Sequence, residues 1–408
     1  MESEVHLSIN TKFEDSSRDK WEEVRIQGAH PSRRSYHSAV AWENNMIVVG
    51  GQDLREGAQP GCWMLKLAET SWEAESWEEL PIEGMGSLCR HSAVVNGNTM
   101  YVFGGCDEGR EFNRILVIDL ETYSLREVLP DSQDCPPPID SHTACLYNDG
   151  TPWMVVFGGF KQGIRSNDVF VNNLTTLKWK KATTSEGPVP RSNHSAVVYK
   201  DALYVFGGAD EEGEKLNDFW KLDLRTYQWE QIQARGSVPT GRSGHSAVIY
   251  KDLMVVFGGM KDITKETNDM FSYDFNTNTW IMFQYEHQVE DPISHEEVEM
   301  FKKARNSPPK QPSPKKSPGT FNRSPTSPKK EDSDKVNFRK KRTLYEGPVS
   351  PLKGRVRGKV PHARDGHSAV LIDDTMFIFG GDRHQMPFND VYAYPLDEKT
   401  IKTPLVAP

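Results

Sequence analysis

The segment Met254-Val-Val-Phe-Gly-Gly259 decides the fold, because it is one of six near copies in the chain. Each copy is a short apolar run that ends in a pair of glycines. The copies occupy residues 46–51, 100–105, 154–159, 203–208, 254–259 and 376–381. Their first glycines are separated by 54, 54, 49, 51 and 122 residues. A period of this length predicts a repeat architecture, in which neighbouring units bury each other's apolar faces.

Each unit contains the signals of four strands. A His-Ser/Thr-Ala triplet lies 13 residues before the first glycine, or 16 in the third unit, and begins at His37, His91, His142, His194, His245 and His367. The runs are short, rich in β-branched and aromatic residues and bounded by turn residues, which is typical of a strand hairpin. Downstream, an Asn that is usually followed by Asp precedes a third strand, at Asn113, Asn167, Asn217, Asn268 and Asn389. We expect these Asn-Asp pairs to cap turns.

A fourth strand is led by Trp179, Trp229 and Trp280 in units three to five. Two units depart from this pattern. The first has two candidate tryptophans, Trp72 and Trp77, and the second has Leu125 in place of Trp.

The double glycine, the Asn-Asp pair and the spaced Trp resemble the kelch repeat, over about residues 20–283 and 356–396. The resemblance implies an all-β, six-bladed kelch β-propeller whose blades are four-stranded antiparallel sheets around a central channel. Trp21 lies 16 residues before His37, the interval that also separates Trp229 from His245. We therefore predict that residues 21–26 form the outer strand of blade 6, beside residues 391–396. The alternative is that residues 400–405 supply that strand.

The long last interval predicts an insertion between blades 5 and 6. The expected division is an N-terminal tail (1–19), the closing strand with blades 1–5 (20–283), a disordered Ser/Pro/Lys-rich insertion (284–355), and blade 6 with a C-terminal tail (356–408). Residues 306–354 have too little apolar content to offset the entropy of ordering. Residues 302–359 carry 18 Lys plus Arg against 4 Asp plus Glu, which is a net charge of +14. Since the whole chain carries −9, about −23 falls on the rest.

Three interpretations of the basic insertion stay open. It could be a solvated spacer. Alternatively, Ser307, Ser313, Ser327 and Ser350 each precede Pro, with Lys two residues after that Pro, a pattern that resembles the target of proline-directed, cyclin-dependent-type kinases. Four phosphates would remove roughly 6 to 8 positive charges. Thirdly, Arg339-Lys-Lys-Arg342 resembles a nuclear import signal, and two Ser-Pro-Lys-Lys segments resemble the minor-groove-binding repeats of linker-histone tails. Nucleic acid is the less favoured polyanion; microtubule tails or acidic lipids would suit the same charges.

An arginine lies three residues before the repeat histidine in four units, at Arg34, Arg191, Arg242 and Arg364. In kelch proteins that bind acidic peptides, arginines at the matching place pair with carboxylates of the ligand. The resemblance therefore implies that these four residues bind a protein partner at the channel mouth. The alternative is that each arginine bonds loop carbonyls or the acids of the preceding blade. Units two and three have Leu88 and Ile139 at this position.

Several functional classes lack support in the sequence. No apolar stretch approaches the ~20 residues of a membrane span, and no secretory signal pattern is present. The cysteines number 5 and include no CxxC pair, which favours a reducing cytosolic or nuclear setting over a disulfide scaffold. Phosphate-loop, zinc-protease and serine-hydrolase motifs are missing, and we expect the histidines to open strands and form local hydrogen bonds. We predict no enzyme activity, metal or cofactor.

The sequence therefore predicts a non-enzymatic interaction scaffold or adaptor that uses its propeller loops, with an insertion regulated by phosphorylation. Two alternatives stay open. One is a substrate receptor of a cullin-type ubiquitin ligase, although no BTB-like or F-box-like segment accompanies the blades. The other is a small-molecule site or an enzyme at the channel mouth. The expected partner is a protein, and an acidic peptide segment is one candidate for the part that binds. The expected location is the cytoplasm, with the nucleus as a second candidate.

Overall fold

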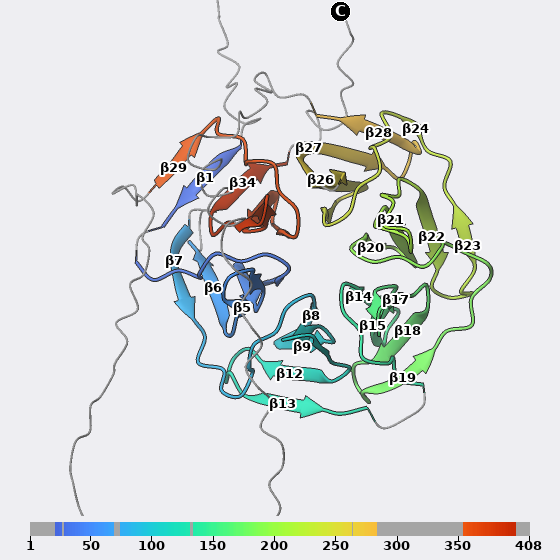
Figure 1. Ribbon diagram of the computed structural model, residues 1–408, viewed down its shortest axis with the longest axis horizontal. Helices are drawn as coiled ribbons and strands as arrows, with labels where there is room; N and C mark the ends of the chain where they lie inside the picture. Colours follow the sequence, from blue (N-terminus) through green and yellow to red (C-terminus); the bar gives the residue numbers. More distant parts are fainter. Residues whose placement is uncertain are drawn as a thin grey trace, which may run out of the picture. The chain divides into compact units, whose positions relative to one another are not determined.

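Six small β-sheets surround a central channel in the computed structural model (Figure 1), which describes residues 21–26, 28–68, 74–130, 134–262, 264–283 and 354–396. The innermost strands of the sheets contact one another in a closed circle. No helix occurs in these described ranges. The prediction of an all-β, six-bladed propeller is confirmed.

Blades 1 to 4 are four-stranded antiparallel sheets, whose strands follow one another from the channel outward. Blade 1 contains β2 (Ser38–Trp42), β3 (Asn45–Val49), β6 (Cys62–Leu67) and β7 (Ala74–Glu79). Blade 2 contains β8 (Ser92–Asn96), β9 (Thr99–Phe103), β12 (Ile115–Asp119) and β13 (Leu125–Val128). Blade 3 contains β14 (Thr143–Asn148), β15 (Pro152–Phe157), β18 (Val169–Asn173) and β19 (Lys178–Lys181). Blade 4 contains β20 (Ser195–Tyr199), β21 (Ala202–Phe206), β22 (Phe219–Asp223) and β23 (Trp229–Gln231).

Blades 5 and 6 each have a fifth strand, which the sequence did not predict. Blade 5 contains β25 (Ser246–Tyr250), β26 (Leu253–Asp262), β27 (Lys265–Asp274), β28 (Thr279–Met282) and the parallel strand β24 (Arg235–Gly236). Blade 6 contains β30 (Ser368–Ile372), β31 (Thr375–Phe379), β34 (Val391–Pro395), β1 (Glu22–Arg25) and β29 (Gly354–Arg357).

Short hairpins follow the double glycine in four blades and project at one face of the ring. They are β4 (Gln52–Asp53) with β5 (Gly57–Ala58), β10 (Cys106–Asp107) with β11 (Arg110–Glu111), β16 (Phe160–Lys161) with β17 (Ile164–Arg165), and β32 (Asp382–Arg383) with β33 (Met386–Pro387). In blade 5 the long strands β26 and β27 continue into the same position.

The two units with irregular sequence resolve as follows. In blade 1, Trp77 occupies the fourth strand, where it pairs with Leu65 of β6, while Trp72 lies outside the described residues. In blade 2, Leu125 begins the fourth strand, as predicted, and pairs with Ile118.

The N-terminal segment closes the ring. Strand β1 pairs antiparallel with β34, so that Glu22 lies opposite Ala393 and Val24 opposite Val391. Trp21 packs against Phe257 of the preceding blade, with ring centroids 5.0 Å apart. The other fourth-strand tryptophans make the same contact, in the pairs Trp77–Phe379, Trp179–Phe103, Trp229–Phe157 and Trp280–Phe206. The predicted closing strand is therefore confirmed, and the alternative segment, residues 400–405, lies outside the described residues.

Strand β29 corrects the predicted end of the insertion. Its four residues pair with β1 on the side away from β34, with Val24 opposite Arg355 and Glu22 opposite Arg357. The backbone N–H of Gly358 continues this ladder by donating to the carbonyl of Trp21 over 2.8 Å. Residues 354 and 355 thus belong to a strand, although they fall inside the range 284–355 for which disorder was expected. The outer edge of β1 offers unpaired backbone groups, and a strand added there satisfies them.

The hydrophobic core lies between blades rather than within them. Each of six buried clusters draws its residues from two neighbouring blades. For example, Phe103 of blade 2 shares a cluster with Met154 and Val156 of blade 3, and Val24 and Phe379 of blade 6 share one with residues of blade 1. No single blade can bury its apolar faces alone, so the ring folds as one unit.

The double glycine is required where each second strand reaches its neighbour. In blade 3, Gly158 and Gly159 have φ of 65° and 97°, which side chains rarely adopt. A Cβ on Gly158 would also lie 2.7 Å from the His194 ring and 2.9 Å from the carbonyl oxygen of Arg191. Both residues belong to the next blade. The glycines therefore permit the close approach of blades around the channel.

Candidate functional site

The four arginines that the sequence assigned to partner binding are buried. Arg191, Arg242 and Arg364 are 0% exposed, and Arg34 is 2% exposed. Each guanidinium donates to the carbonyl of the first glycine in its own blade over 2.7–2.9 Å, at Gly50, Gly207, Gly258 and Gly380. Side chains with so little exposure cannot reach a ligand, so the prediction that these four arginines bind a protein partner is wrong. The structure instead supports the alternative, in which they bond loop carbonyls and acids.

Three of these arginines form two-pronged pairs with the aspartates of their own blades. The pairs are Arg191–Asp218 (2.7 and 2.7 Å), Arg242–Asp269 (2.7 and 3.3 Å) and Arg364–Asp390 (2.6 and 3.0 Å). Burial alone would raise the pKa of Asp269, but the hydrogen bonds from Arg242 hold this pKa below its usual value. The acids come from the same blade rather than the preceding one. Charge and fork geometry are thus satisfied inside the protein.

The Asn at this position ties neighbouring parts of the ring together in blades 2, 3 and 5. The Asn side chain donates to a proline carbonyl in the linker that enters the next blade: Asn113 to Pro136 (3.1 Å), Asn167 to Pro188 (3.0 Å) and Asn268 to Pro361 (3.1 Å). The Asp that follows pairs with a buried arginine in blades 4 to 6. In these three blades the Asn side chain therefore bonds to a proline carbonyl, where a bond to a backbone amide was expected.

Arg34 has no aspartate partner among the residues that the structure describes, because blade 1 lacks the Asn-Asp pair. Its guanidinium donates to the carbonyl of Gly50 and to the hydroxyl and carbonyl of Ser32, over 2.7–3.1 Å. Burial without a paired carboxylate lowers the pKa of Arg34 to about 10. Arg34 therefore stays charged at neutral pH and serves the structure of blade 1.

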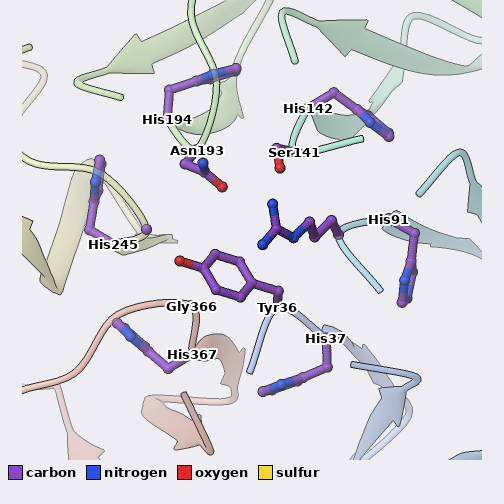
Figure 2. Close-up of a pocket in the computed structure, with 12 residues that line it drawn as sticks. Tyr36, His37, His91, Ser141, His142, Asn193, His194, His245, Gly366 and His367 are labelled. Carbon is purple, nitrogen blue, oxygen red and sulfur yellow. The ribbon is translucent and has the colours of Figure 1, made fainter. Parts of the chain in front are cut away.

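The six repeat histidines form a ring of contacts between blades (Figure 2). Five of them bond through Nε2 to a Ser or Thr hydroxyl of the preceding blade, over 2.7–2.8 Å: His37–Ser368, His142–Ser92, His194–Thr143, His245–Ser195 and His367–Ser246. The exception is His91, whose ring nitrogens have no hydrogen-bond partner among the described residues. Local hydrogen bonds were expected for these histidines. The observed bonds instead join each blade to the preceding one.

Burial controls the protonation of this ring. It lowers the pKa of His91, His142 and His367 to about 3, and it lowers the pKa of His37, His194 and His245 well below the usual value. The histidines are therefore neutral at physiological pH. Their spread around the ring and their use in interblade bonds leave them poorly placed to bind one metal ion.

The residue before each histidine lines the channel and forms a second ring, made only of backbone. Its members are Tyr36, Arg90, Ser141, Asn193, Gly244 and Gly366, all with φ between 51° and 65°. The N–H of each member donates to the carbonyl of the member in the preceding blade over 2.7–3.0 Å, and Tyr36 closes the circle by donating to Gly366. Six N–H groups and six carbonyls thus satisfy one another around the channel.

Two large side chains of this ring, Tyr36 and Arg90, fill the channel mouth. Figure 2 shows Tyr36 lying across the opening, with its hydroxyl pointing away from blade 1. That hydroxyl donates to Oδ2 of Asp365 over 2.6 Å. The Arg90 guanidinium lies 5.0 Å from the centroid of the Tyr36 ring, a cation–π contact. A cavity of about 120 Å³ remains among the six ring residues and the six histidines.

Arg90 also lines a larger pocket of about 700 Å³, which we call the mouth pocket. Its walls come from the projecting hairpins of blades 1 to 3 and from the segments that enter blades 2 to 4. The lining residues include Gln52, Glu108, Glu111, Phe160 and Arg165. Arg165 is already bonded, to Ser192 over 3.0 Å and to the backbone carbonyl of Glu211. The Arg90 guanidinium forms no ion pair with a described carboxylate, which distinguishes it from Arg191, Arg242 and Arg364.

Three carboxyl groups lie close together on the opposite side of the channel mouth. Oxygens of Glu266, Asp365 and Asp382 lie within 4.8 Å of one another, the only such set of possible metal ligands in the ranges the structure describes. Burial raises the pKa of Asp365 to about 7 and that of Asp382 to about 6. The raised pKa values favour protonated carboxyl groups, and the Tyr36 hydroxyl donates to Asp365, so we assign no metal to this group.

Sequence reasoning missed Arg90 and the ring to which it belongs. The available signal was the position immediately before each histidine, where Gly occurs twice and Asn once. Those residue types favour a positive φ and indicate a special backbone position. The predicted phosphorylation sites Ser307, Ser313, Ser327 and Ser350 and the predicted import signal Arg339, Lys340, Lys341 and Arg342 lie outside the described residues.

Comparisons with known proteins agree with this geometry. The family model "FBX42, beta-propeller domain" matches residues 88–280, and the model of the Kelch motif matches residues 363–400. The chain is a kelch-repeat β-propeller. It is 26% identical over 306 residues to Kelch domain-containing protein 2 of Bos taurus, a match that covers 65% of this chain and 73% of that protein.

Other kelch-repeat relatives are much longer than this chain. It is 29% identical over 280 residues to the Leucine-zipper-like transcriptional regulator 1 homolog of Drosophila melanogaster, which covers 64% of this chain and 27% of that protein. It is 28% identical over 291 residues to Host cell factor 2 of Homo sapiens, covering 65% and 35% respectively. The matched region thus spans about a third or less of such relatives. The solved structure of YjhT shares the fold, with a TM-score of 0.59 and 13% identity over 89% of this chain and 95% of that one.

Within the described part of this kelch propeller, no helix is both long and apolar enough to cross a bilayer.

Proposed function

We propose that this kelch propeller is a non-enzymatic scaffold that binds a protein partner in the mouth pocket, and that Arg90 pairs with a carboxylate of that partner. The observation that carries the proposal is the guanidinium of Arg90, which has no ion pair with a described carboxylate and lines a pocket of about 700 Å³. This volume is within the range of sites that take a ligand group or a short peptide. The pocket is built by variable hairpins on a rigid ring, where recognition usually resides.

The charges around the pocket favour a partner segment with a single acidic group over a strongly acidic one. Glu108 and Glu111 line the walls, and about −23 of formal charge lies outside the basic insertion. Repeated carboxylates would therefore be repelled, while one carboxylate aligned with Arg90 gains a charge-assisted bond. Catalysis is disfavoured, because the six histidines at the channel are buried, neutral and engaged between blades.

The test compares Arg90→Gln with a matched variant, Arg126→Gln, on the exposed outer strand β13. Each full-length protein is used for quantitative affinity capture from cells of the source organism, and the interaction with each captured partner is then measured with purified components. We expect Arg90→Gln to lower the affinity for the partner at least tenfold, since a bond to a charged group is lost. Arg126→Gln should leave that affinity unchanged. Equal affinity for both variants would overturn the role of Arg90.

The same capture discriminates between the alternatives. Stoichiometric cullin or adaptor subunits would favour a ubiquitin-ligase receptor, and a small molecule that copurifies and is lost with Arg90→Gln would favour a small-molecule site. We further propose that phosphorylation of Ser307, Ser313, Ser327 and Ser350 reduces the positive charge of the insertion and thereby tunes partner affinity or nuclear entry. Replacing these four serines by alanine should remove the effect of phosphatase treatment on capture. An effect that persists would contradict this regulatory role.

A further inference from the structure

Two cysteines, Cys89 and Cys106, face each other in blade 2. Cys89 immediately precedes Arg90, and Cys106 immediately follows the double glycine of the same blade. They form an isolated antiparallel bridge in which each backbone N–H donates to the other residue's carbonyl, over 3.0 and 2.9 Å. Their Sγ atoms lie 3.6 Å apart.

This backbone arrangement suits a disulfide. Residues that exchange both backbone hydrogen bonds across antiparallel strands have Cα atoms about 5.5 Å apart. Disulfides span Cα separations of about 4.4–6.8 Å and need sulfur atoms about 2.05 Å apart. The two sulfurs must therefore approach by roughly 1.5 Å, which side-chain rotation can supply while the backbone bridge stays in place.

The pair also lies in the wall of a pocket, with Cys106 partly exposed and Cys89 buried behind it at 4% exposure. Both residues line the mouth pocket. By contrast, Cys62 is 0% exposed, and burial raises the pKa of Cys62 and of Cys145 to about 12. Those two thiols are therefore unreactive. The cysteines differ in environment, and only the facing pair combines a pocket with a second sulfur at contact distance among the described residues.

The two sulfurs have unequal acidities. The hydrogen bond between the two thiols, assisted by the nearby Arg90 guanidinium, holds the pKa of Cys89 below its usual value. The same bond, together with burial, raises the pKa of Cys106. Cys89 is thus the better nucleophile, and Cys106 is positioned to resolve the oxidised sulfur.

We propose that Cys89 and Cys106 are a redox-active dithiol, which a hydroperoxide oxidises to an intramolecular disulfide in the wall of the mouth pocket. The Cys89 thiolate attacks the terminal peroxide oxygen, the O–O bond breaks, and the alcohol (water, for hydrogen peroxide) leaves with a proton, giving a sulfenic acid at Cys89. The Cys106 sulfur then attacks the Cys89 sulfur, the S–O bond breaks, and the hydroxyl leaves as water with the Cys106 proton. Two electrons pass from the sulfurs to the peroxide.

The experiment counts thiols in the full-length protein before and after hydrogen peroxide. The reduced protein is oxidised, unfolded in guanidinium, alkylated with iodoacetamide and weighed by intact mass spectrometry. The chain has 5 cysteines, so the reduced protein should gain five alkyl groups and the oxidised protein three. Peptide mapping should identify the missing pair as a Cys89–Cys106 cross-link, and dithiothreitol should restore all five.

Variants distinguish this pair from other oxidation. Cys106→Ser has four cysteines and cannot form the cross-link. After mild oxidation without dimedone, and after reduction of the sulfenic acid, all four thiols should be alkylated. When dimedone is present, it should label Cys89. Cys145→Ser, the matched control, should still lose two thiols. The proposal is overturned if the wild type retains five thiols, if the cross-link joins other cysteines, or if Cys89→Ser loses two thiols as the wild type does.

Discussion

Blades 2 and 3 place an apolar side chain where blades 4, 5 and 6 place an arginine. Leu88 and Ile139 are 1% exposed and belong to interblade core clusters, whereas Arg191 is 0% exposed and paired with Asp218. The backbone is nevertheless the same. The second glycine of the preceding blade donates to the carbonyl of Leu88, Ile139 or Arg191, each time over 2.8 Å. A buried ion pair and a buried hydrocarbon are thus alternative ways to fill one position.

The position that holds the paired Asp changes together with the arginine. In blade 3 the Asp is retained without an arginine, and Asp168 pairs with Lys161 and Lys181 at 2.9 and 2.8 Å. In blade 2 the Asp is replaced by Arg114, which pairs with Glu127 nearer the surface. The propeller therefore accepts either an ion pair or an apolar side chain at this position, provided that no buried charge is left unpaired. This agrees with the high cost of removing charges from water.

Acid should produce the largest effect, and it tests the histidine ring that all six blades share. His91, His142 and His367 have a folded pKa of about 3, below the unfolded value of about 6.5. The unfolded chain therefore takes up protons first, and stability is complete above pH 6.5 and falls as the pH drops toward 3. Between pH 7 and pH 5 each of these histidines costs about 2 kcal/mol.

Two carboxyl groups oppose that loss. Asp365 and Asp382 have folded pKa values raised to about 7 and 6, so they contribute stability on acidification, about 2 and 1 kcal/mol over the same interval. The other three histidines, whose pKa is also lowered, add to the loss. Urea unfolding at pH 7 and pH 5 should show a clear net destabilisation at pH 5. A midpoint that is unchanged or higher at pH 5 would contradict buried, neutral histidines.

Removing one member of a buried pair should give the next largest effect. Asp269→Leu leaves Arg242 charged and uncompensated inside blade 5, at an expected cost of about 3–5 kcal/mol. Adding Arg242→Leu removes the uncompensated charge and gives blade 5 the residue type that blade 2 has at Leu88, so it should recover most of that loss. The control is Asp168→Leu in blade 3, which breaks only the ion pairs to the half-exposed Lys161 and Lys181 and should cost about 1 kcal/mol or less.

These free energies are measured by urea unfolding at pH 7. If the double variant is as unstable as Asp269→Leu, the ion pair of blade 5 cannot be exchanged for hydrocarbon, and blades 2 and 3 must differ from it in some further way.

The smallest effect concerns His91, the one repeat histidine whose ring makes no interblade hydrogen bond among the described residues. His142→Phe removes the 2.7 Å bond to Ser92 and leaves that buried hydroxyl without its partner, whereas His91→Phe removes no side-chain bond of this kind. We expect His142→Phe to be the more destabilising by about 1 kcal/mol. The ring volume changes equally in both variants, so the difference in unfolding free energy reports the hydrogen bond. The reverse order would show that His91 has an interaction of equal worth.

The architecture was predictable because a propeller repeats its signals. The double glycine and the histidine each recur six times, and the spaced Trp recurs in most blades. Trp21 is recognised as a blade 6 residue by its distance of 16 residues from His37 alone. The added strands β24 and β29 were not predictable. Gly354–Arg357 is short and lies in basic, glycine-containing sequence without alternation, and its pairing with β1 depends on an edge that only the folded ring creates.

The site was predicted less well, because the sequence does not give the direction in which each side chain points. Arg191, Arg242 and Arg364 lie near the channel in sequence and in space, but periodicity does not state whether a side chain points toward solvent or toward its own blade. Their partners, Asp218, Asp269 and Asp390, are 26 or 27 residues away. Arg90 was missed because its unit lacks the arginine pattern, and the position that it occupies varies from Tyr to Gly.

That variation follows from the circle of main-chain hydrogen bonds at the channel. Since the circle uses no side-chain atom, it places one restriction on each of its six residues, a backbone that can turn to positive φ. Mutation can therefore change the side chains that line the channel while the main-chain hydrogen bonds between blades are kept. A lineage of such proteins can acquire new ligands at six adjacent positions, at a conformational cost of only about 1–2 kcal/mol where the residue is not glycine.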